Sequence, residues 1–540
     1  MVLLRHETIH QRSDLMRKES PLIVKVEQEK NESNLSSFGA IPTFLEFLNG
    51  FQFDRMVGAT FKDKSNQGYS SFHHILTLIL LNLTDGQSVS DVERLEEDSG
   101  LKRVFKKLEK KLNGLKGRIF RKGRTRVFPS ASCIFNFLDR FNLDAEETER
   151  ESTPEGKSKI LPVADSFEGL VELNRSIVCQ SQILSPQQTA TLDMDNNLIV
   201  TNKCTAKTSY KKDLSYHPFN VYWAEKDLML FSEFRDGNVP AGKEQLRILK
   251  ESLSLLPAGV KKVTVRSDTA GYQHNFLEFM EAGTSRFGKI RFSVSCDVSK
   301  SFRQAVLEVD EQEWEPIVVT DTEGNRYVTK QEVAEVFFIP ETKNKRKNAP
   351  VFRYLATREA VDVQYEFQDN GQISTFTSEY VEQKLHLEEM EEKIYKVFGI
   401  VTNQEGTPLD IVLNHRKRCG KSEQEHSRLT KDMAGGRFPS GSFGENAAWW
   451  YLSIISLNLL KLFQRHALPK ELKQVRLKTL NARLFRIALK AVESGRQLIV
   501  KIGRGHSLFD LIIHAQNKIL ELDEKLSSKG LWLENQSQIQ

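Results

Sequence analysis

The spacing of apolar residues predicts a helical region in the first third of the chain. Between residues 41 and 150, apolar side chains recur three and four positions apart, as in Phe44, Phe47, Leu48 and Phe51. This is the period of a helix that packs one face on a core. Several short helices are therefore expected here, whereas residues 1–37 are polar, lack periodicity and are expected to be poorly ordered.

From about residue 167 the pattern changes to the alternation typical of strands. Strands are predicted at 190–201, 219–223, 228–234, 262–266 and 290–295, with helices at 242–255 and 273–282. This order of strands and helices predicts a mixed α/β sheet.

The remainder of the chain divides into a β-rich part and a helical part. Between residues 300 and 400, short β-type segments alternate with charged turns and predict a mostly β insertion. After it, helices are predicted at 422–433, 443–463 and 470–496, then a strand at 497–502 and a helical tail from residue 508.

Composition narrows the class of protein. The chain has 540 residues, 39% of them hydrophobic and 28% charged, which predicts more than one globular domain. The longest apolar stretch, Ile75 to Leu83, is too short to cross a bilayer, and no secretory signal is expected. The five cysteines are scattered and never spaced C-x-x-C, which argues against a disulfide framework or zinc knot and favours a reducing cytosol.

Two basic runs point to a polyanionic partner. Between Leu101 and Arg126, twelve basic residues face one acid, Glu109, although the net charge of the whole chain is only +5. Such a block repels itself unless phosphates neutralise it, so DNA or RNA is the favoured partner; a solvated helix face or a linker is the alternative. The candidate phosphate contacts in this block and in a second run are Arg121, Lys122, Arg124, Arg126, Lys343, Lys345, Arg346 and Lys347.

Three aspartates lie in or at the end of predicted strands. Asp193 and Asp195 alternate with apolar residues, so both point to one face of the sheet. Asp268 follows the strand 262–266, at the carboxyl end where ligand sites of open α/β sheets form. With a further acid from a nearby helix, they would form an all-oxygen site of the kind magnesium prefers. Aspartates that cap turns or pair with basic residues are the alternative.

Several segments carry a resemblance to a known family. They are DGQSVSDVERLEEDSGLKRVF, FPSASCIFNFLDRF, TLDMDNNLIVTNK, YKKDLSYHPFNVYWAE, FRDGNVPAG, VTVRSDTAGYQ and RCGKSEQEHSRLTKDMAGGRFPSGSFGENAAWW. From about residue 65 to 505 the sequence resembles bacterial insertion-sequence transposases of the DDE type. It is closest to the family numbered thirteen-eighty and more distantly similar to piggyBac elements.

The resemblance implies a set of catalytic, metal-binding carboxylates. The family's first acid falls on Asp195, with Asp193 as a possible substitute, and its second falls on Asp268. The third falls on Glu423, in a helix motif where Glu425 is the alternative. The resemblance also assigns DNA contacts to Arg418, Lys431, Arg266 and Lys421.

The resemblance further implies an RNase H-like catalytic core that is interrupted by the β-rich insertion. The expected divisions are a flexible N-terminus 1–37, a helical DNA-binding and dimerisation region 38–165, core parts 166–300 and 403–465, the insertion 301–402 and a C-terminal helical region 466–540.

The implied function is cut-and-paste transposition. The protein would bind the terminal inverted repeats of its element as a homodimer on double-stranded DNA in the bacterial cytoplasm. It would use two Mg²⁺ ions, with Mn²⁺ as a substitute, to cleave and join strands, and a hairpin route is one option. Because Asn196, Asn197 and Gln424 depart from the family pattern, a DNA-binding protein that no longer cuts is the alternative. An RNase H-like nuclease without strand transfer is a third interpretation.

Overall fold

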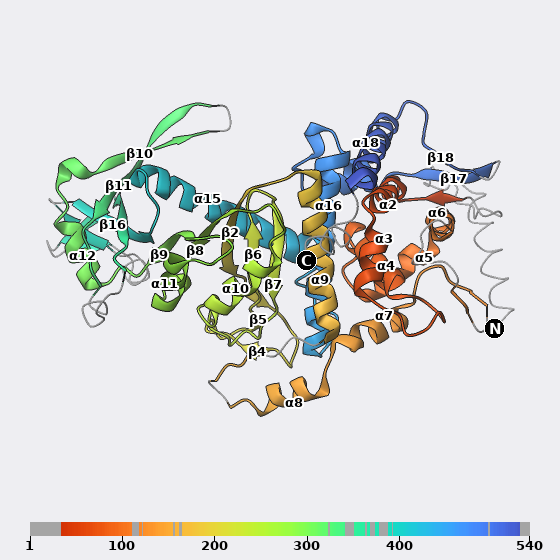
Figure 1. Ribbon diagram of the computed structural model, residues 1–540, viewed down its shortest axis with the longest axis horizontal. Helices are drawn as coiled ribbons and strands as arrows, with labels where there is room; N and C mark the ends of the chain where they lie inside the picture. The colour runs from red at the N-terminus through yellow and green to blue at the C-terminus, as the bar shows by residue number, and fades with distance from the viewer. Residues whose placement is uncertain are drawn as a thin grey trace.

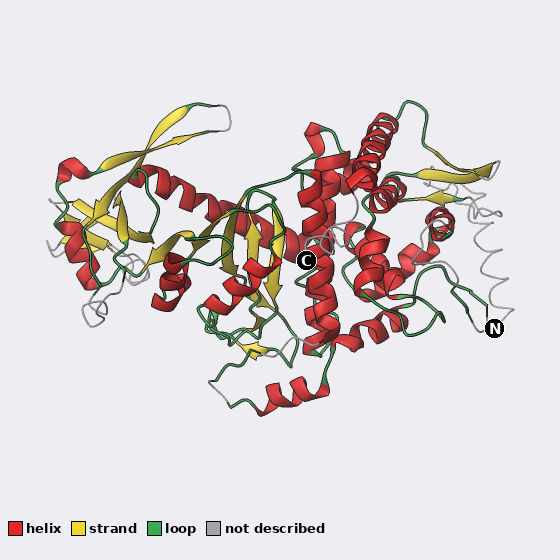
Figure 2. Cartoon of the chain, in the orientation of Figure 1, coloured by secondary structure: helices red, strands yellow, loops and turns green. Residues whose placement is uncertain are grey.

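The computed structural model describes most of the chain. The described residues are 34–110, 118–120, 123–154, 157–160, 165–321, 324–340, 350–361, 364–367, 373–376, 387–390, 393–494 and 497–529. Within them the fold is a mixed α/β structure, with strands at one end of the long axis and most helices at the other (Figure 2).

A mixed sheet lies at the centre of the fold. Strand β2 (Thr189–Asn196) pairs in parallel with β8 (Lys262–Ser267), which pairs in parallel with β9 (Arg291–Cys296). On its other side β2 pairs antiparallel with β6 (Phe219–Trp223), and β6 pairs antiparallel with β7 (Leu228–Glu233). These five strands lie at the positions that the alternating pattern predicts, in the order β7-β6-β2-β8-β9.

The same sheet continues through the region predicted as an insertion. Strand β9 pairs antiparallel with β16 (Lys393–Thr402), and β12 (Arg353–Val361), β11 (Arg326–Val336) and β10 (Glu315–Thr320) follow outward. With β15 (Leu387–Met390) beside β16, the described residues form a sheet of ten strands. The β-rich segment is thus joined edge to edge with the central strands.

One buried helix connects the sheet to the helical end. Helix α16 (Phe443–Ala467) is buried along almost all of its length and lies beside α9 (Asp165–Leu184), as Figure 1 shows. Its Asn458 accepts a hydrogen bond from the Met229 amide of β7 at 2.9 Å and donates to Asn174 of α9 at 2.8 Å. These buried polar groups are satisfied, so they hold the helix in one position on the sheet.

The front helices share their core with the sheet. They are α2 (Ile41–Gly50), α3 (Phe53–Thr60), α4 (Ser71–Leu83), α5 (Val92–Glu97), α6 (Ser99–Glu109), α7 (Ala131–Leu138) and α8 (Asp144–Ser152). Helix α4 packs on α16, and the C-terminal helix α18 (Leu508–Lys529) packs on α2. Phe44 and Trp223 belong to one continuous hydrophobic core, so the helical region does not stand apart from the sheet.

The helix predicted over 470–496 is wrong. The chain forms a short helix, α17 (Leu477–Leu480), a single π-helical turn (Asn481–Phe485) and then strand β17 (Leu489–Ser494). Leu489 and Ala491 alternate into the core, and β17 pairs with both β18 (Gln497–Lys501) and β1 (Leu35–Ser36). No helix in the described part of the chain is long and apolar enough to cross a bilayer.

Candidate active site

Asp195 and Asp268 lie side by side at the carboxyl ends of two adjacent parallel strands. The register of β2 and β8 places Met194 opposite Ser267, so the residue that follows each of them is an aspartate. Asp195 is part of β2, whereas Asp268 caps a short 3₁₀ helix (Thr269–Gly271) by accepting a hydrogen bond from the Ala270 amide at 3.1 Å. Neighbouring parallel strands thus bring two carboxylates, far apart in sequence, to one edge.

The charge of Asp195 acts on Asp268. Burial and the negative charge of Asp195 together raise the pKa of Asp268 above its ordinary value. The guanidinium of Arg418 works in the opposite direction and lies 3.4 Å from an Asp195 carboxylate oxygen. A negative cluster of this kind is stabilised by a nearby cation.

Asp193 forms an ion pair with Arg266. Its carboxylate accepts two hydrogen bonds from the Arg266 guanidinium, at 2.5 and 2.7 Å, and both side chains are almost completely buried. Arg266 also donates to the backbone carbonyl oxygen of Asn414. A bidentate buried pair with this geometry is typical of a structural ion pair, since each charge is neutralised inside the fold.

Helix α15 (Pro408–Ser427) crosses the central strands one after another. His415 contacts Ser293 and Ser295 of β9, Asn414 contacts Arg266 of β8, Arg418 contacts Asp195 of β2, and His426 contacts Asn220 of β6. From His415 to His426 a helix rises about 17 Å, and three strand spacings amount to roughly 14 Å. The helix therefore runs across the strands, and its side chains reach the sheet at fixed intervals.

Glu425, one of the two candidates for the third acid, has a buried cationic partner. Its carboxylate pairs with Lys461 of α16, and the same ammonium group lies 3.1 Å from Asp227. Asp227 follows β6, which is antiparallel to β2, so this cluster lies at the amino end of β2. Glu425 is thus directed away from the edge that carries Asp195 and Asp268.

Glu423 lies two residues earlier on α15 and is exposed. Two residues turn a helix by about 200°, so Glu423 projects from the opposite side to Glu425. Its negative charge, like that of Asp195, acts to raise the pKa of His426, although burial keeps that pKa below its ordinary value.

The three predicted carboxylates do not form a metal-binding cluster among the described residues. Within the residues that the structure describes, no group of three or more His, Cys, Asp or Glu side chains is arranged to hold a metal ion. Asp195 and Asp268 are neighbours at adjacent strand ends, and Glu423 lies on α15, the helix that crosses the strands carrying them.

A hollow of about 600 Å³ opens beside Asp268. Asn196, Asn197 and His217 line it, and the side chain of Asn196 donates a hydrogen bond to the Ala241 carbonyl oxygen at 3.1 Å. Nδ1 of His217 donates a hydrogen bond to the Val239 carbonyl oxygen at 2.8 Å, because a carbonyl oxygen can only accept. The quoted family segments include His217 and His426, but no role was predicted for either; the fold brings both close enough to Asp195 for its charge to act on their pKa values.

The remaining predicted DNA contacts lie in three kinds of environment. Lys421 and Lys431 are exposed on α15 and on the turn after it. Arg124 forms a two-bonded ion pair with Glu109, and Arg126 does the same with Glu93. The predicted contacts that lie outside the described residues are Arg121, Lys122, Lys343, Lys345, Arg346 and Lys347.

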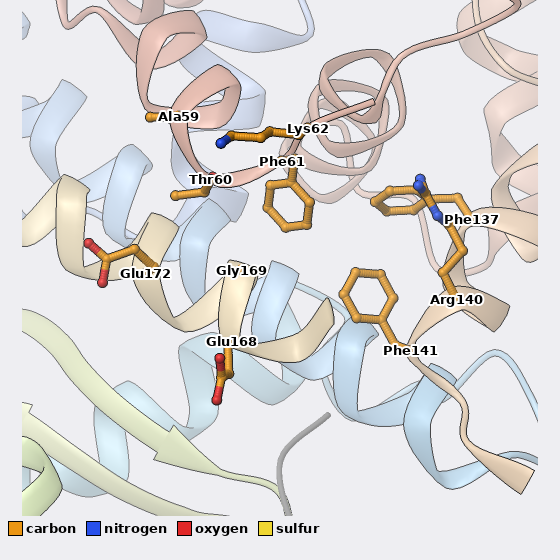
Figure 3. Close-up of a pocket in the computed structure, with 10 residues that line it drawn as sticks. All are labelled: Ala59, Thr60, Phe61, Lys62, Phe137, Arg140, Phe141, Glu168, Gly169 and Glu172. Carbon is orange, nitrogen blue, oxygen red and sulfur yellow. The ribbon is translucent and has the colours of Figure 1, made fainter. Parts of the chain in front are cut away.

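A separate hollow of about 460 Å³ lies among the front helices, away from these acids (Figure 3). The rings of Phe61, Phe137 and Phe141 face it, with Arg140 beside Phe137. Two cations and two glutamates line it, so it has no excess of either charge.

Comparison with known proteins identifies the family. A mixed sheet that brings two aspartates together at adjacent strand ends agrees with a DDE-type domain. The family described as "Transposase DDE domain group 1" matches residues 22–524, and the chain belongs to this family. The predicted resemblance to DDE transposases is thereby confirmed.

Among solved structures, the chain is similar to the cryo-EM structure of a piggyBac transposase synaptic complex with hairpin DNA. The identity is 10% and the TM-score is 0.33, over 81% of this chain and 84% of that one. No curated protein matches this chain.

Proposed function

We propose that this protein is a DNA transposase that binds the terminal inverted repeats of its insertion sequence and catalyses metal-dependent strand cleavage and strand transfer. The observation that carries the proposal is the pair formed by Asp195 and Asp268 at the ends of β2 and β8. The order β7-β6-β2-β8-β9, with only β2, β8 and β9 parallel, supports an RNase H-like core.

The donor set fits divalent magnesium. Asp195, Asp268 and Glu423 would hold two Mg²⁺ ions, or Mn²⁺ in their place, because carboxylate oxygens are the ligands that these hard cations prefer. When bound, such ions activate the attacking oxygen and stabilise the leaving oxygen of a phosphodiester. The mutual repulsion of Asp195 and Asp268 is the feature of this chain that favours cation binding.

The direction of side chains on α15 supports Glu423 as the third ligand. Glu425 is held by Lys461 at the amino end of β2, so the opposite side of the helix, which carries Glu423, would face the carboxyl end with Asp195 and Asp268. Arg418 counters the charge of Asp195 in this arrangement and would be free to contact a DNA phosphate once a metal ion provides the positive charge.

DNA would approach over the exposed side of α15. Lys421 and Lys431 are exposed there and would contact backbone phosphates, which fix the position of a duplex without reading its sequence. Joining two element ends to a target requires at least two copies of the chain in the working complex. A hairpin intermediate on the cut strand is part of this proposal.

The experiment is a nicking assay on a duplex taken from the DNA that flanks the gene. The protein is expected to nick the element end in Mg²⁺ or Mn²⁺ and to yield joined products when a target duplex is added. Asp268→Asn is expected to lower nicking by more than ~100-fold, since removing even an outer partner of a metal ligand has an effect of 10–100-fold. Binding of the same duplex should stay within about twofold.

The alternative is a DNA-binding protein of the same family that no longer cuts. The absence of a three-acid cluster among the described residues favours this alternative. A pure protein that binds the element end, yet nicks it in neither metal, would support the alternative over cleavage.

A further inference from the structure

A third hollow lies near the candidate active site, where the front helices meet the sheet. It has a volume of about 520 Å³ and is formed by four chain segments that are distant in sequence. They are residues 87–90 before α5, Phe135 of α7, residues 200–203 after β2, and residues 436–439 between α15 and α16.

The side chains in this hollow suit a phosphate. Lys203 and Arg437 line it, together with the exposed hydroxyl-bearing residues Ser88 and Ser90. None of the described residues that line it is acidic. An ammonium group, a guanidinium group and hydroxyl groups are the donors with which proteins bind phosphate oxygens of DNA.

Among the described residues, neither of these two cations has a carboxylate partner. Within the described part of the chain, no ion pair joins Lys203 or Arg437 to an aspartate or glutamate, in contrast to Arg124 and Arg126 of the basic block. The nearest acid in the same segment, Asp91, accepts hydrogen bonds from the Gln87 and Ser88 amides. The positive charge in the hollow is thus left for an anion from outside.

The hollow is continuous in the chain with the active-site edge. Asn197 lines the hollow beside Asp268, and Val200 lines this one, only three residues further on. Three residues span at most about 10 Å, which is within roughly three nucleotide steps of a duplex. A DNA strand with a phosphate at Asp195 and Asp268 would therefore bring a phosphate close to Lys203 and Arg437.

We propose that this hollow, with Lys203 and Arg437, binds a backbone phosphate of duplex DNA a few nucleotides from the bond that is cut. The inference rests on the proposed function, because the duplex must first be a ligand of this protein. The front hollow of Figure 3 differs in composition, since two glutamates, Glu168 and Glu172, line it together with its two cations.

The test measures duplex binding by the full chain at 50 and 200 mM salt, with a duplex from the DNA flanking the gene. The variants are Lys203→Ala, Arg437→Ala and their double variant, with Lys203→Arg as the charge-retaining version. Lys518→Ala on α18 is the matched control, because it removes the same charge at a distant lysine that pairs with Glu521. Thermal melting confirms that each variant is folded.

Each lost phosphate contact lowers the slope of log affinity against log salt by about 0.9. The fall in affinity from 50 to 200 mM salt should thus shrink by about 3.5-fold for each single alanine variant and by roughly 12-fold for the double variant. Lys203→Arg and Lys518→Ala should match the parent. Phosphate ethylation of the duplex should interfere with binding by the parent about two to four nucleotides from the nick, and the double variant should lose that interference.

The outcomes separate this inference from the proposed function. A double variant that keeps the parent's slope and ethylation pattern would overturn the assignment of a DNA phosphate to this hollow, even if the hollow binds free inorganic phosphate. In that case, nicking by the parent would leave the proposed function intact. A parent protein that neither binds nor nicks the duplex would overturn both.

Discussion

Individual residues in the site acquire their roles from neighbours that are remote in sequence. Asp193 and Asp195 are two positions apart and point to the same face, yet they have different partners: Asp193 forms a buried bidentate pair with Arg266 of the adjacent strand, and Asp195 lies 3.4 Å from Arg418 of α15. The alternation in the sequence predicts that both face one side, and the family motif selects Asp195. The partner of Asp193 could not be predicted, because the register of β2 on β8 decides which side chain Arg266 meets.

The same reasoning separates Glu423 from Glu425. Glu423→Gln is expected to lower nicking by more than ~100-fold with little change in melting temperature, because Glu423 is exposed. Glu425→Gln weakens one of the two carboxylate contacts of Lys461, while Asp227 still pairs with it, and is expected to destabilise the protein by about 1–3 kcal/mol. Nicking rates and urea unfolding of both variants check this. Loss of nicking in the folded Glu425→Gln protein, with normal nicking by Glu423→Gln, would reverse the assignment.

Among the elements, α15 shows the limit of predicting a helix from the spacing of its apolar residues. A helix was expected only from residue 422, but it begins at Pro408, after Thr407 caps it by accepting a hydrogen bond from the Asp410 amide. Ile411 and Val412 in its first half are buried against apolar side chains of the sheet, but this apolar run ends at Leu413 and is too short to mark a helix in sequence. The central strands, in contrast, are short and largely buried, and they were predicted within a few residues.

Two glycines in helices provide a matched pair of stability predictions. A Cβ at Gly420 in α15 would meet nothing within 4 Å, so Gly420→Ala should stabilise the protein by about 0.5–1 kcal/mol through lower entropy of the unfolded chain. At Gly444 in α16 a Cβ would lie 2.0 Å from the Phe141 carbonyl oxygen, so Gly444→Ala should destabilise. Unfolding free energies measure both, and equal effects of the same sign would contradict the packing described for α15 and α16.

At the scale of the whole molecule, charge is shared between segments. The basic block contains a single acid in sequence, but in the fold Arg118 pairs with Asp63, Arg126 with Glu93, and Lys102 lies near Glu96. Acids outside the block thus partly neutralise it, and a count of charges within one stretch of sequence cannot show this. The hollow with Lys203 and Arg437 shows the converse: these cations are far apart in sequence, and the fold brings them together.

Stability of the whole molecule should decline in mild acid. Burial lowers the pKa of His74 and of His466 to about 4, whereas in the unfolded chain both return to about 6.5. Above pH 6.5 both states are neutral and stability is complete; between pH 6.5 and 4 the unfolded chain gains the protons first, so stability falls. Each histidine contributes a slope of up to about 1.4 kcal/mol per pH unit.

Urea unfolding of the parent and of His74→Gln at several pH values between 7.5 and 4.5 tests this. The variant should lose part of the slope below pH 6.5. An identical pH dependence in the two proteins would show that protonation of His74 is not linked to unfolding.

The central claim is that Asp195, Asp268 and Glu423 together hold two divalent ions, and a count of bound Mn²⁺ tests it most directly. The measurement is equilibrium dialysis of the protein with an uncut element-end duplex, followed by metal analysis, for the parent and for Asp195→Asn, Asp268→Asn and Glu423→Gln. Two bound ions per chain in the parent, and fewer in each folded variant, are the predicted result. An unchanged count of ions in all three variants would contradict the account.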